Sequence, residues 1–326
     1  MIEVGDTPLL EVDNIYAKLE CANPLGSIKD RMAKHIIEQS EKNGLLKPGM
    51  TIVEASSGNT GIALSYFAKQ KGYPIIIVMP RNMTDERKRI LTELGAELIL
   101  CSEGNFKEAA NIRDEIATDP KYFNPDQFSN SLNVECHYRT TAQEILNQMK
   151  PHADVIDAFV SGVGTGGTII GCGKRLKEVF PKIRIVAVEP TESPVMSGGA
   201  PGIHGIQGIG DGFIPAIVSN GHGGLNKLVD EVACCSTDQA KSAAKYLAEK
   251  KGICVGMSSG ANFSAAKKIA DTYGTTVTIF PDGFSKYKSQ GLTRNGSGPC
   301  RYVSECNCPT RVQCDGKGSG MNCKCS

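Results

Sequence analysis

Lys29 is the residue best suited to covalent chemistry in this sequence of 326 residues. It follows a short strand-like run at residues 15–20, and Ser27 is expected to cap a helix beginning at Ile28, which places Lys29 in the first helical turn. The helix dipole disfavours an ammonium charge at that end. A lysine that loses its proton readily can form a Schiff base with a carbonyl compound. The spacing therefore predicts Lys29 as a catalytic residue.

A second motif, far downstream, is suited to binding phosphate. Residues 155–161 predict a strand, and it is followed by Gly162-Val163-Gly164-Thr165-Gly166-Gly167-Thr168, whose glycine N–H groups meet at the start of a predicted helix. With Glu189 about 20 residues later, the pattern also imitates a dinucleotide fingerprint. The two threonine hydroxyls suit a single terminal phosphate, and Lys29 has no use in a nicotinamide site. Together, the lysine and the cradle indicate an aldehyde cofactor held covalently, with a nicotinamide oxidoreductase as the alternative.

Two further segments offer hydroxyl and amide groups. Ser56, Ser57, Asn59 and Thr60 lie where a predicted strand meets a helix at residues 62–71, so their N–H groups and hydroxyls suit an anion. If that anion is a carboxylate, Gln127 could supply an amide donor to it. Ser258 likewise lies between a short apolar run and a helix. In both segments a plain helix cap is the alternative.

The elements that must position these groups alternate between strand and helix. Strands are expected at residues 51–54, 73–79, 97–101, 155–161, 183–188 and 276–280, and helices at residues 85–95, 105–118, 141–150, 167–180, 237–251 and 261–273. This alternation predicts an α/β protein with mostly parallel sheets. Residues 193–212 are rich in glycine and proline and lack periodicity. Their contents favour a mobile loop over the site, with a plain surface loop as the alternative.

The composition of the chain argues against two classes of binding partner, nucleic acids and membranes. The 36 basic and 35 acidic residues give a formal net charge of +1, which provides no electrostatic footprint for nucleic acid. No apolar run approaches the roughly 20 residues that span a bilayer, and the acidic start at residues 1–6 does not predict a signal peptide. We therefore expect a cytoplasmic protein with neither a nucleic-acid nor a membrane partner. Its length predicts two domains.

Six cysteines crowd into the end of the chain, after a linker-like segment at residues 295–299. They are Cys300, Cys306, Cys308, Cys314, Cys323 and Cys325. They include two C-x-C pairs, whose thiolates can bind one soft cation, such as zinc, and so order a segment without an apolar core. The tail resembles a small metallothionein-like module. Redox disulfides or a tail without function are the alternatives.

The motifs occur together in a known family. Residues 23–31, 57–61, 164–168, 206–215 and Ser258 correspond in order to motifs of the cysteine synthase and cystathionine β-synthase family, the fold-type II pyridoxal-phosphate enzymes, which the chain resembles over about residues 7–282. The resemblance implies two three-layer α/β/α domains, as in the tryptophan synthase β chain. A smaller mobile domain would comprise residues 33–142, a larger cofactor-binding domain residues 1–32 and 143–290, and the linker and tail residues 291–326. It also implies a homodimer.

The resemblance also implies roles for individual residues. Lys29 would form the internal aldimine with pyridoxal 5'-phosphate and move the Cα proton, while Asn59 would bind the phenolic oxygen of the cofactor. Gly164, Thr165, Gly166, Gly167 and Thr168 would hold the phosphate, and the neutral hydroxyl of Ser258 would face the pyridine nitrogen. The substrate α-carboxylate would be bound by Ser56, Ser57, Asn59, Thr60 and Gln127. Closure of the smaller domain on that carboxylate would exclude water.

The reaction implied is β-replacement on a β-substituted alanine through an aminoacrylate, with sulfide or a thiol as nucleophile. O-acetylserine, serine, O-phosphoserine and cysteine are the candidate substrates. Asp211 stands where cysteine synthases often carry a small apolar residue, and a carboxylate there could act as a base that favours serine or cysteine; a solvent-facing loop acid is the alternative. β-Elimination that releases sulfide, as in a cysteine lyase, and a metal-handling protein that retains the enzyme core are the rival functions. Threonine and serine dehydratases share the fold but lack the pattern at residues 27–31.

Overall fold

Two β-sheets form the framework of the computed structural model, which describes residues 2–284, 287 and 292. The larger sheet has the strand order β1 (Leu9–Val12), β2 (Ile15–Leu19), β10 (Thr276–Phe280), β7 (Ala158–Gly162), β8 (Arg184–Pro190) and β9 (Glu231–Cys235). Only β1 runs antiparallel to its neighbour. The central strands β7, β8 and β10 are almost entirely buried, as expected for parallel strands that are covered on both faces.

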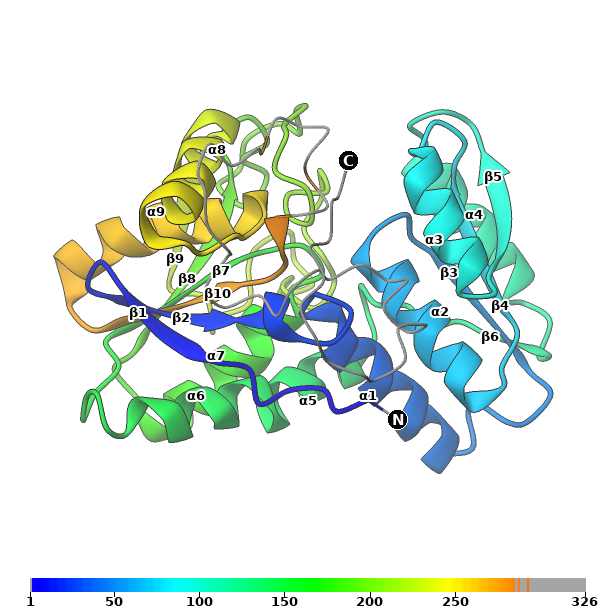
Figure 1. Cartoon of the computed structure of the whole chain (residues 1–326), viewed down its shortest axis with the longest axis horizontal. Coiled ribbons are helices and arrows are strands. Elements are labelled where there is room, and N and C mark those ends of the chain that lie inside the picture. Colours follow the sequence, from blue (N-terminus) through cyan, green and yellow to red (C-terminus); the bar gives the residue numbers. More distant parts are fainter. Residues whose placement is uncertain (1, 285–286, 288–291, 293–326) are drawn as a thin grey trace, which may run out of the picture.

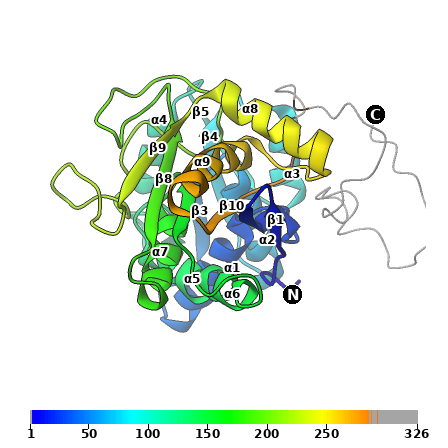
Figure 2. The same cartoon turned by 90° about the vertical axis from the view of Figure 1, so that its left-hand side faces the viewer.

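Helices cover both faces of this sheet. In Figures 1 and 2, α8 (Thr237–Tyr246) and α9 (Met257–Tyr273) lie on one face, and α5 (Ser131–Arg139), α6 (Thr141–Met149) and α7 (Gly167–Val179) on the other. Each face has its own apolar core, centred on residues such as Val160 and Val188 on one side and Phe159 and Ile185 on the other. Successive side chains along each strand point to opposite faces of the sheet and therefore pack against two layers of helices.

The smaller sheet is wholly parallel. Its strand order is β5 (Glu97–Cys101), β4 (Ile75–Pro80), β3 (Thr51–Ala55) and β6 (Tyr122–Phe123). Figure 1 shows it as a separate body with α2 (Asn59–Lys71), α3 (Asp85–Glu93) and α4 (Phe106–Ile116). Helix α1 (Lys29–Lys42) packs against both α2 and α5, so it joins the helix layers of the two sheets.

The α/β class with mostly parallel sheets is confirmed, and every predicted strand and helix has a counterpart. Helix α1 begins at Lys29, one residue later than predicted, while the N–H of Lys29 still donates to Ser27 Oγ at 3.3 Å. Helix α9 begins at Met257, four residues before the predicted start at residue 261, because the whole Ser258 motif is helical. The elements that were not predicted are β1, β6, β9 and α5, which are short or polar.

Several sequence-based expectations remain predictions. The segment at residues 193–212 contains no helix or strand, as expected, but its mobility is untested. The proposed domain bounds also remain a prediction. The six tail cysteines lie outside the described residues. Within the described residues, no group of three or more His, Cys, Asp or Glu side chains could hold a metal ion, and no helix is long and apolar enough to cross a bilayer.

Candidate active site

Lys29 is the first residue of α1, and the residues just before it contact the chain that follows β10. The N–H of Ile28 donates to the carbonyl of Pro281 at 2.8 Å, and Ser27 pairs with Asp282, so the strand end fixes the first turn of α1. The Lys29 side chain is half-buried. Burial lowers the pKa of its amine, and the carboxylates of Asp211 and Asp282 act in the opposite direction. The structure therefore supports the expected readily deprotonated lysine, with burial as the cause of the lowered pKa.

The predicted phosphate cradle forms a tight turn between β7 and α7. A Cβ on Gly164 would lie 2.3 Å from the carbonyl oxygen of Gly208, and one on Gly166 would lie 2.1 Å from a methyl group of Val218. Gly166 also has a φ of 87°, which favours glycine. Thr165 Oγ1 accepts a hydrogen bond from Asn133 Nδ2 at 2.9 Å. The cradle therefore leads directly into the N-terminus of α7, where backbone N–H groups suit an anion.

Asp282 is the centre of a hydrogen-bond network that includes Asn59 of the hydroxyl-rich loop. Asp282 Oδ2 accepts hydrogen bonds from Asn59 Nδ2 at 2.9 Å and from the Tyr287 hydroxyl at 2.7 Å. Asp282 Oδ1 is buried without a hydrogen-bond partner among the described residues. A Cβ on Gly256 would lie 2.2 Å from that oxygen, and Ser258 is buried just beyond, in the first turn of α9. Asp282 thus links Asn59, through a hydrogen bond, with Lys29, through its charge.

The predicted substrate-binding residues also converge. Thr60 Oγ1 donates to Gln127 Oε1 at 2.7 Å, although 67 residues separate them. Ser56 Oγ accepts hydrogen bonds from the N–H groups of Gly58 and Gly61, at 3.3 and 3.1 Å, and so shapes the turn that carries Ser57. The structure therefore brings the hydroxyl loop and Gln127 together at one end of α2, as the expected carboxylate site requires.

Asp211 faces the same region from the long loop of the larger body. The N–H of Gly210 donates to the carbonyl of Val163 at 3.0 Å, so the loop is attached beside the cradle. Asp211 is exposed to solvent, but the protein atoms around its carboxyl displace enough water to raise its pKa, whereas Lys29 and His204 act to lower it. The carboxylate of Asp211 and the amine of Lys29 influence each other's pKa, which agrees with the predicted position near the site. The exposed side chain also agrees with the alternative, a solvent-facing loop acid.

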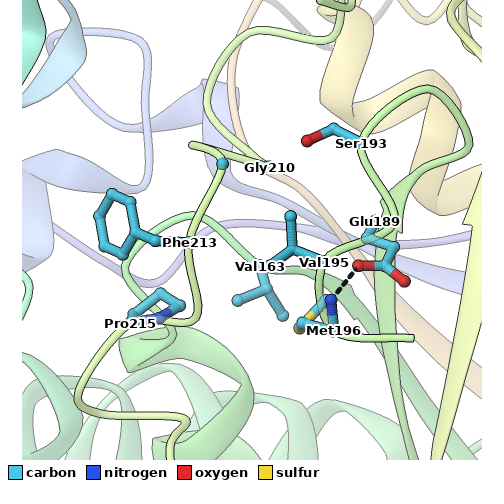
Figure 3. A pocket seen from close by; sticks show the side chains of 9 residues that line it. Val163, Glu189, Ser193, Val195, Met196, Gly210, Phe213 and Pro215 are labelled. Carbon is cyan, nitrogen blue, oxygen red and sulfur yellow. Dashed lines mark hydrogen bonds between the residues drawn. The ribbon is translucent and has the colours of Figure 1, made fainter. Parts of the chain in front are cut away.

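Glu189, the acid that the dinucleotide interpretation assigns to a ribose, lines a small cavity beside this loop. Figure 3 shows Val163, Gly210 and Phe213 on one side of it and Glu189 and Met196 on the other. Glu189 is buried, and its carboxylate accepts hydrogen bonds from the N–H groups of Met196 at 2.7 Å and Ser197 at 3.0 Å. Because its oxygens hold the loop, Glu189 is not presented to a ribose.

Sequence reasoning missed Asp282, Tyr287, Asn133 and the buried His137. Asp282 carried a signal, since it comes two residues after a fully buried strand. Asn133 and His137 lie four residues apart on α5, and only the packing of α5 against α7 brings them to the cradle.

Comparisons with known proteins agree with this geometry. A family model described as pyridoxal-phosphate dependent enzyme matches residues 1–282. A cysteine synthase from Staphylococcus aureus (strain N315) is 42% identical over 305 residues, covering 89% of this chain and 94% of that protein. Among solved structures, O-acetyl serine sulfhydrylase isoform 3 from Entamoeba histolytica is 40% identical with a TM-score of 0.83, covering 91% of this chain and 92% of that one. A hydrogen sulfide-producing enzyme from Fusobacterium nucleatum is 39% identical with a TM-score of 0.83, covering 92% of each chain.

Proposed function

Because the chain belongs to the family of pyridoxal-phosphate dependent enzymes, we propose that it catalyses β-replacement on a β-substituted alanine, with sulfide or a thiol as nucleophile. One observation carries the proposal: a lysine of lowered pKa and Asn59 of the hydroxyl-amide loop both interact with Asp282. The same lysine acts on His137, which lies 3.4 Å from Thr168 of the glycine-threonine cradle. These groups match an aldehyde, a phosphate and a carboxylate. The similarity to cysteine synthases supports the choice of reaction.

The residues present fit pyridoxal phosphate. At Gly164 and Gly166 a Cβ would clash with Gly208 and Val218, so only glycine allows the tight turn of the cradle. The orphaned Asp282 Oδ1 marks a polar position that the described residues do not satisfy. In the proposed site, Gly164, Thr165, Gly166, Gly167 and Thr168 hold the phosphate, Asn59 binds the phenolic oxygen, and Ser258 faces the ring nitrogen. When bound, the cofactor supplies an aldehyde that joins an amine and a ring that withdraws electrons from Cα.

The protein's own groups then control the protons and water. Lys29, once its amine is free, takes the Cα proton of the substrate. Ser258 offers a neutral hydroxyl and does not enforce protonation of the ring nitrogen, so electron withdrawal is moderate and loss of a β-substituent is favoured over other outcomes. Ser56, Ser57, Asn59, Thr60 and Gln127 bind the α-carboxylate, and movement of the smaller domain, residues 33–142, toward residues 1–32 and 143–290 excludes water.

Asp211 supports a second candidate, β-elimination that releases sulfide from cysteine. Its raised pKa and its interaction with Lys29 suit an acid-base group that can exchange a proton with the departing oxygen or sulfur. Similarity to hydrogen sulfide-producing enzymes is consistent with this candidate. In this assignment Asp211 sets the preference for serine or cysteine over an acetyl ester.

Product analysis separates the two reactions. Purified enzyme is supplied with O-acetylserine, serine, O-phosphoserine or cysteine, with and without sulfide, and cysteine, pyruvate and sulfide are measured. Asp211→Ala should lower turnover of serine and cysteine relative to O-acetylserine. An unchanged preference removes the role of Asp211, and an absence of products from all four substrates contradicts the proposed function.

We also propose a cytoplasmic homodimer whose tail binds a soft metal ion through Cys300, Cys306, Cys308, Cys314, Cys323 and Cys325. The C-x-C spacing supports the metal, and the family resemblance supports the dimer. Sedimentation should give twice the chain mass, and fractionated cells should hold the protein in the cytoplasm. The paired change Cys306→Ser with Cys308→Ser should lower metal content; an untagged wild-type protein free of metal in reducing buffer contradicts the site.

A further inference from the structure

Helix α5 lies beneath the phosphate cradle, and two of its side chains reach the two cradle threonines. Asn133 Nδ2 donates to Thr165 Oγ1 at 2.9 Å, and His137 Nε2 lies 3.4 Å from Thr168 Oγ1. Asn133 and His137 are 1% and 2% exposed, so neither interaction is exchanged with bulk water.

Glycines on α7 make this contact possible. A Cβ on Gly167 would lie 2.1 Å from Asn133 Oδ1, and one on Gly171 would lie 2.4 Å from the carbonyl oxygen of Val134 and 2.8 Å from His137 Cβ. Any larger residue would push α5 away. The close approach therefore places Asn133 and His137, one helical turn apart, under the first turn of α7.

The hydrogen bonds at Thr165 fix the direction of its hydroxyl proton. Its Oγ1 accepts from Asn133 Nδ2 and from the N–H of Gly167 at 3.4 Å. A hydroxyl oxygen has two lone pairs and one proton. With both lone pairs engaged, the proton is left to be donated away from α5, toward the position proposed for the phosphate.

At Thr168 Oγ1, His137 as the donor would engage one lone pair and so turn the hydroxyl proton away from the imidazole. His137 Nδ1 lies 2.9 Å from Thr141 Oγ1, and each imidazole nitrogen can be donor or acceptor. Burial, together with the charges of Lys29, Arg31 and His35, holds the pKa of His137 well below its usual value, so the ring is neutral and carries a single N–H. A phosphate only accepts hydrogen bonds, so both threonines serve it best as donors.

We propose that Asn133 and His137 are positioning residues for the phosphate: they donate to Thr165 Oγ1 and Thr168 Oγ1 and so direct both threonine hydroxyl protons toward it. His137 is then the Nε2–H tautomer, and Thr141 donates to its Nδ1. This inference rests on the proposed cofactor site and adds a supporting layer that touches no cofactor atom.

Paired substitutions test the inference through cofactor affinity. Asn133→Asp keeps the shape but turns the donor into a charged acceptor, with Asn130→Asp as the matched control, because aspartate preserves the cap at the start of α5. His137→Gln retains a donor near Nε2, whereas His137→Asn places its amide near Nδ1. Dissociation constants are measured for pyridoxal 5'-phosphate and for pyridoxal, which lacks the phosphate.

The ratio of the two constants distinguishes positioning from folding. Asn133→Asp and His137→Asn should weaken pyridoxal 5'-phosphate binding by about 10-fold or more while leaving pyridoxal binding unchanged, and Asn130→Asp and His137→Gln should resemble wild type. Equal losses for both vitamers, or His137→Asn resembling wild type while His137→Gln loses affinity, overturn the inference. If wild type binds neither vitamer, the proposed function itself fails. The imidazole nitrogen chemical shifts of His137 should show the Nε2–H tautomer, and the Nδ1–H tautomer contradicts it.

Discussion

Arg87 on α3 donates from Nη2 to Gln207 Oε1 at 2.6 Å, across the space between the two sheets. Arg87 belongs to the helix layer of the smaller sheet, and Gln207 to the long loop that also carries Asp211. The bond is partly buried and charge-assisted. It therefore ties the smaller body to the loop that lines the site.

We expect Gln207→Ala to weaken closure over the substrate. Because a hydrogen bond to a charged group contributes about 1.5 kcal/mol or more, the KM for the amino-acid substrate should rise by about 3- to 10-fold at this half-exposed contact, with a smaller change in cofactor affinity. Steady-state kinetics with wild type and Gln207→Glu, which retains an acceptor for Arg87, provide the comparison. Unchanged KM values in Gln207→Ala contradict a closing role.

Imine formation at Lys29 should shift with pH when Asp211 is changed. The carboxylate of Asp211 stabilises the ammonium form and so raises the Lys29 pKa, opposing the lowering by burial. Asp211→Asn removes that charge, so the Lys29 pKa should fall and the rate of imine formation in apoenzyme should reach its plateau at lower pH. Stopped-flow absorbance against pH measures the shift, with Asp211→Glu as the control that retains the charge. A shift to higher pH would mean that Asp211 does not act on Lys29 through its charge.

A buried ion network behind Lys29 should govern acid stability. Arg31 donates to Glu20 at 2.6 Å and to Glu144 at 2.6 Å, and Lys18 contacts Glu144 at 2.7 Å. Burial acts to raise the pKa of Glu144, but Arg31 and Lys18 outweigh it and hold the pKa at about 2, below the usual 4.5. The resulting stabilisation is complete above pH 4.5 and is lost as the pH falls toward 2.

Glu144→Gln should therefore remove part of this pH dependence. A shift of this size corresponds to about 3 kcal/mol of unfolding free energy, and the variant should be destabilised near neutral pH by a similar amount. Urea unfolding at several pH values between 2 and 7 measures the difference, with Glu135→Gln, an exposed pair to Arg139, as the control. Parallel pH curves for wild type and Glu144→Gln exclude the low pKa of Glu144.

Because α5 packs closely on α7, replacing two nearby glycines of α7 by alanine should lower the free energy of unfolding by different amounts. Gly171→Ala should destabilise the fold by about 2 kcal/mol, because the new methyl group meets backbone of α5. At Gly173 a Cβ meets methyl groups of Ile185 and Leu228 at 3.2 Å, and alanine favours helix, so Gly173→Ala should change stability by less than about 1 kcal/mol. Chemical denaturation compares them, and equal effects rule out the tight contact.

The main parts of the site could be predicted because each depends on a local strand-turn-helix signal. Lys29, Asn59, Thr165 and Ser258 lie in the first turns of helices or at their N-terminal boundaries, and the structure places them there. Glycine and hydroxyl residues in such turns have a direct physical reason to be present.

The supporting residues could not be predicted, since their partners are distant in sequence. Asp282 meets Asn59 across 223 residues, and Asn133 meets Thr165 across 32. Helix α5 is short and has only weak apolar periodicity, so its own sequence did not indicate a helix under the cradle. Such contacts arise from how sheets and helices cross, which periodicity alone does not specify.

Borohydride reduction of the enzyme with pyridoxal 5'-phosphate, followed by peptide mapping, tests the central claim most directly. We expect an absorbing imine and a stable phosphopyridoxyl group on the peptide that contains Lys29, and neither in Lys29→Ala. An unmodified Lys29 peptide in wild type, or an equally labelled Lys29→Ala variant, would contradict it.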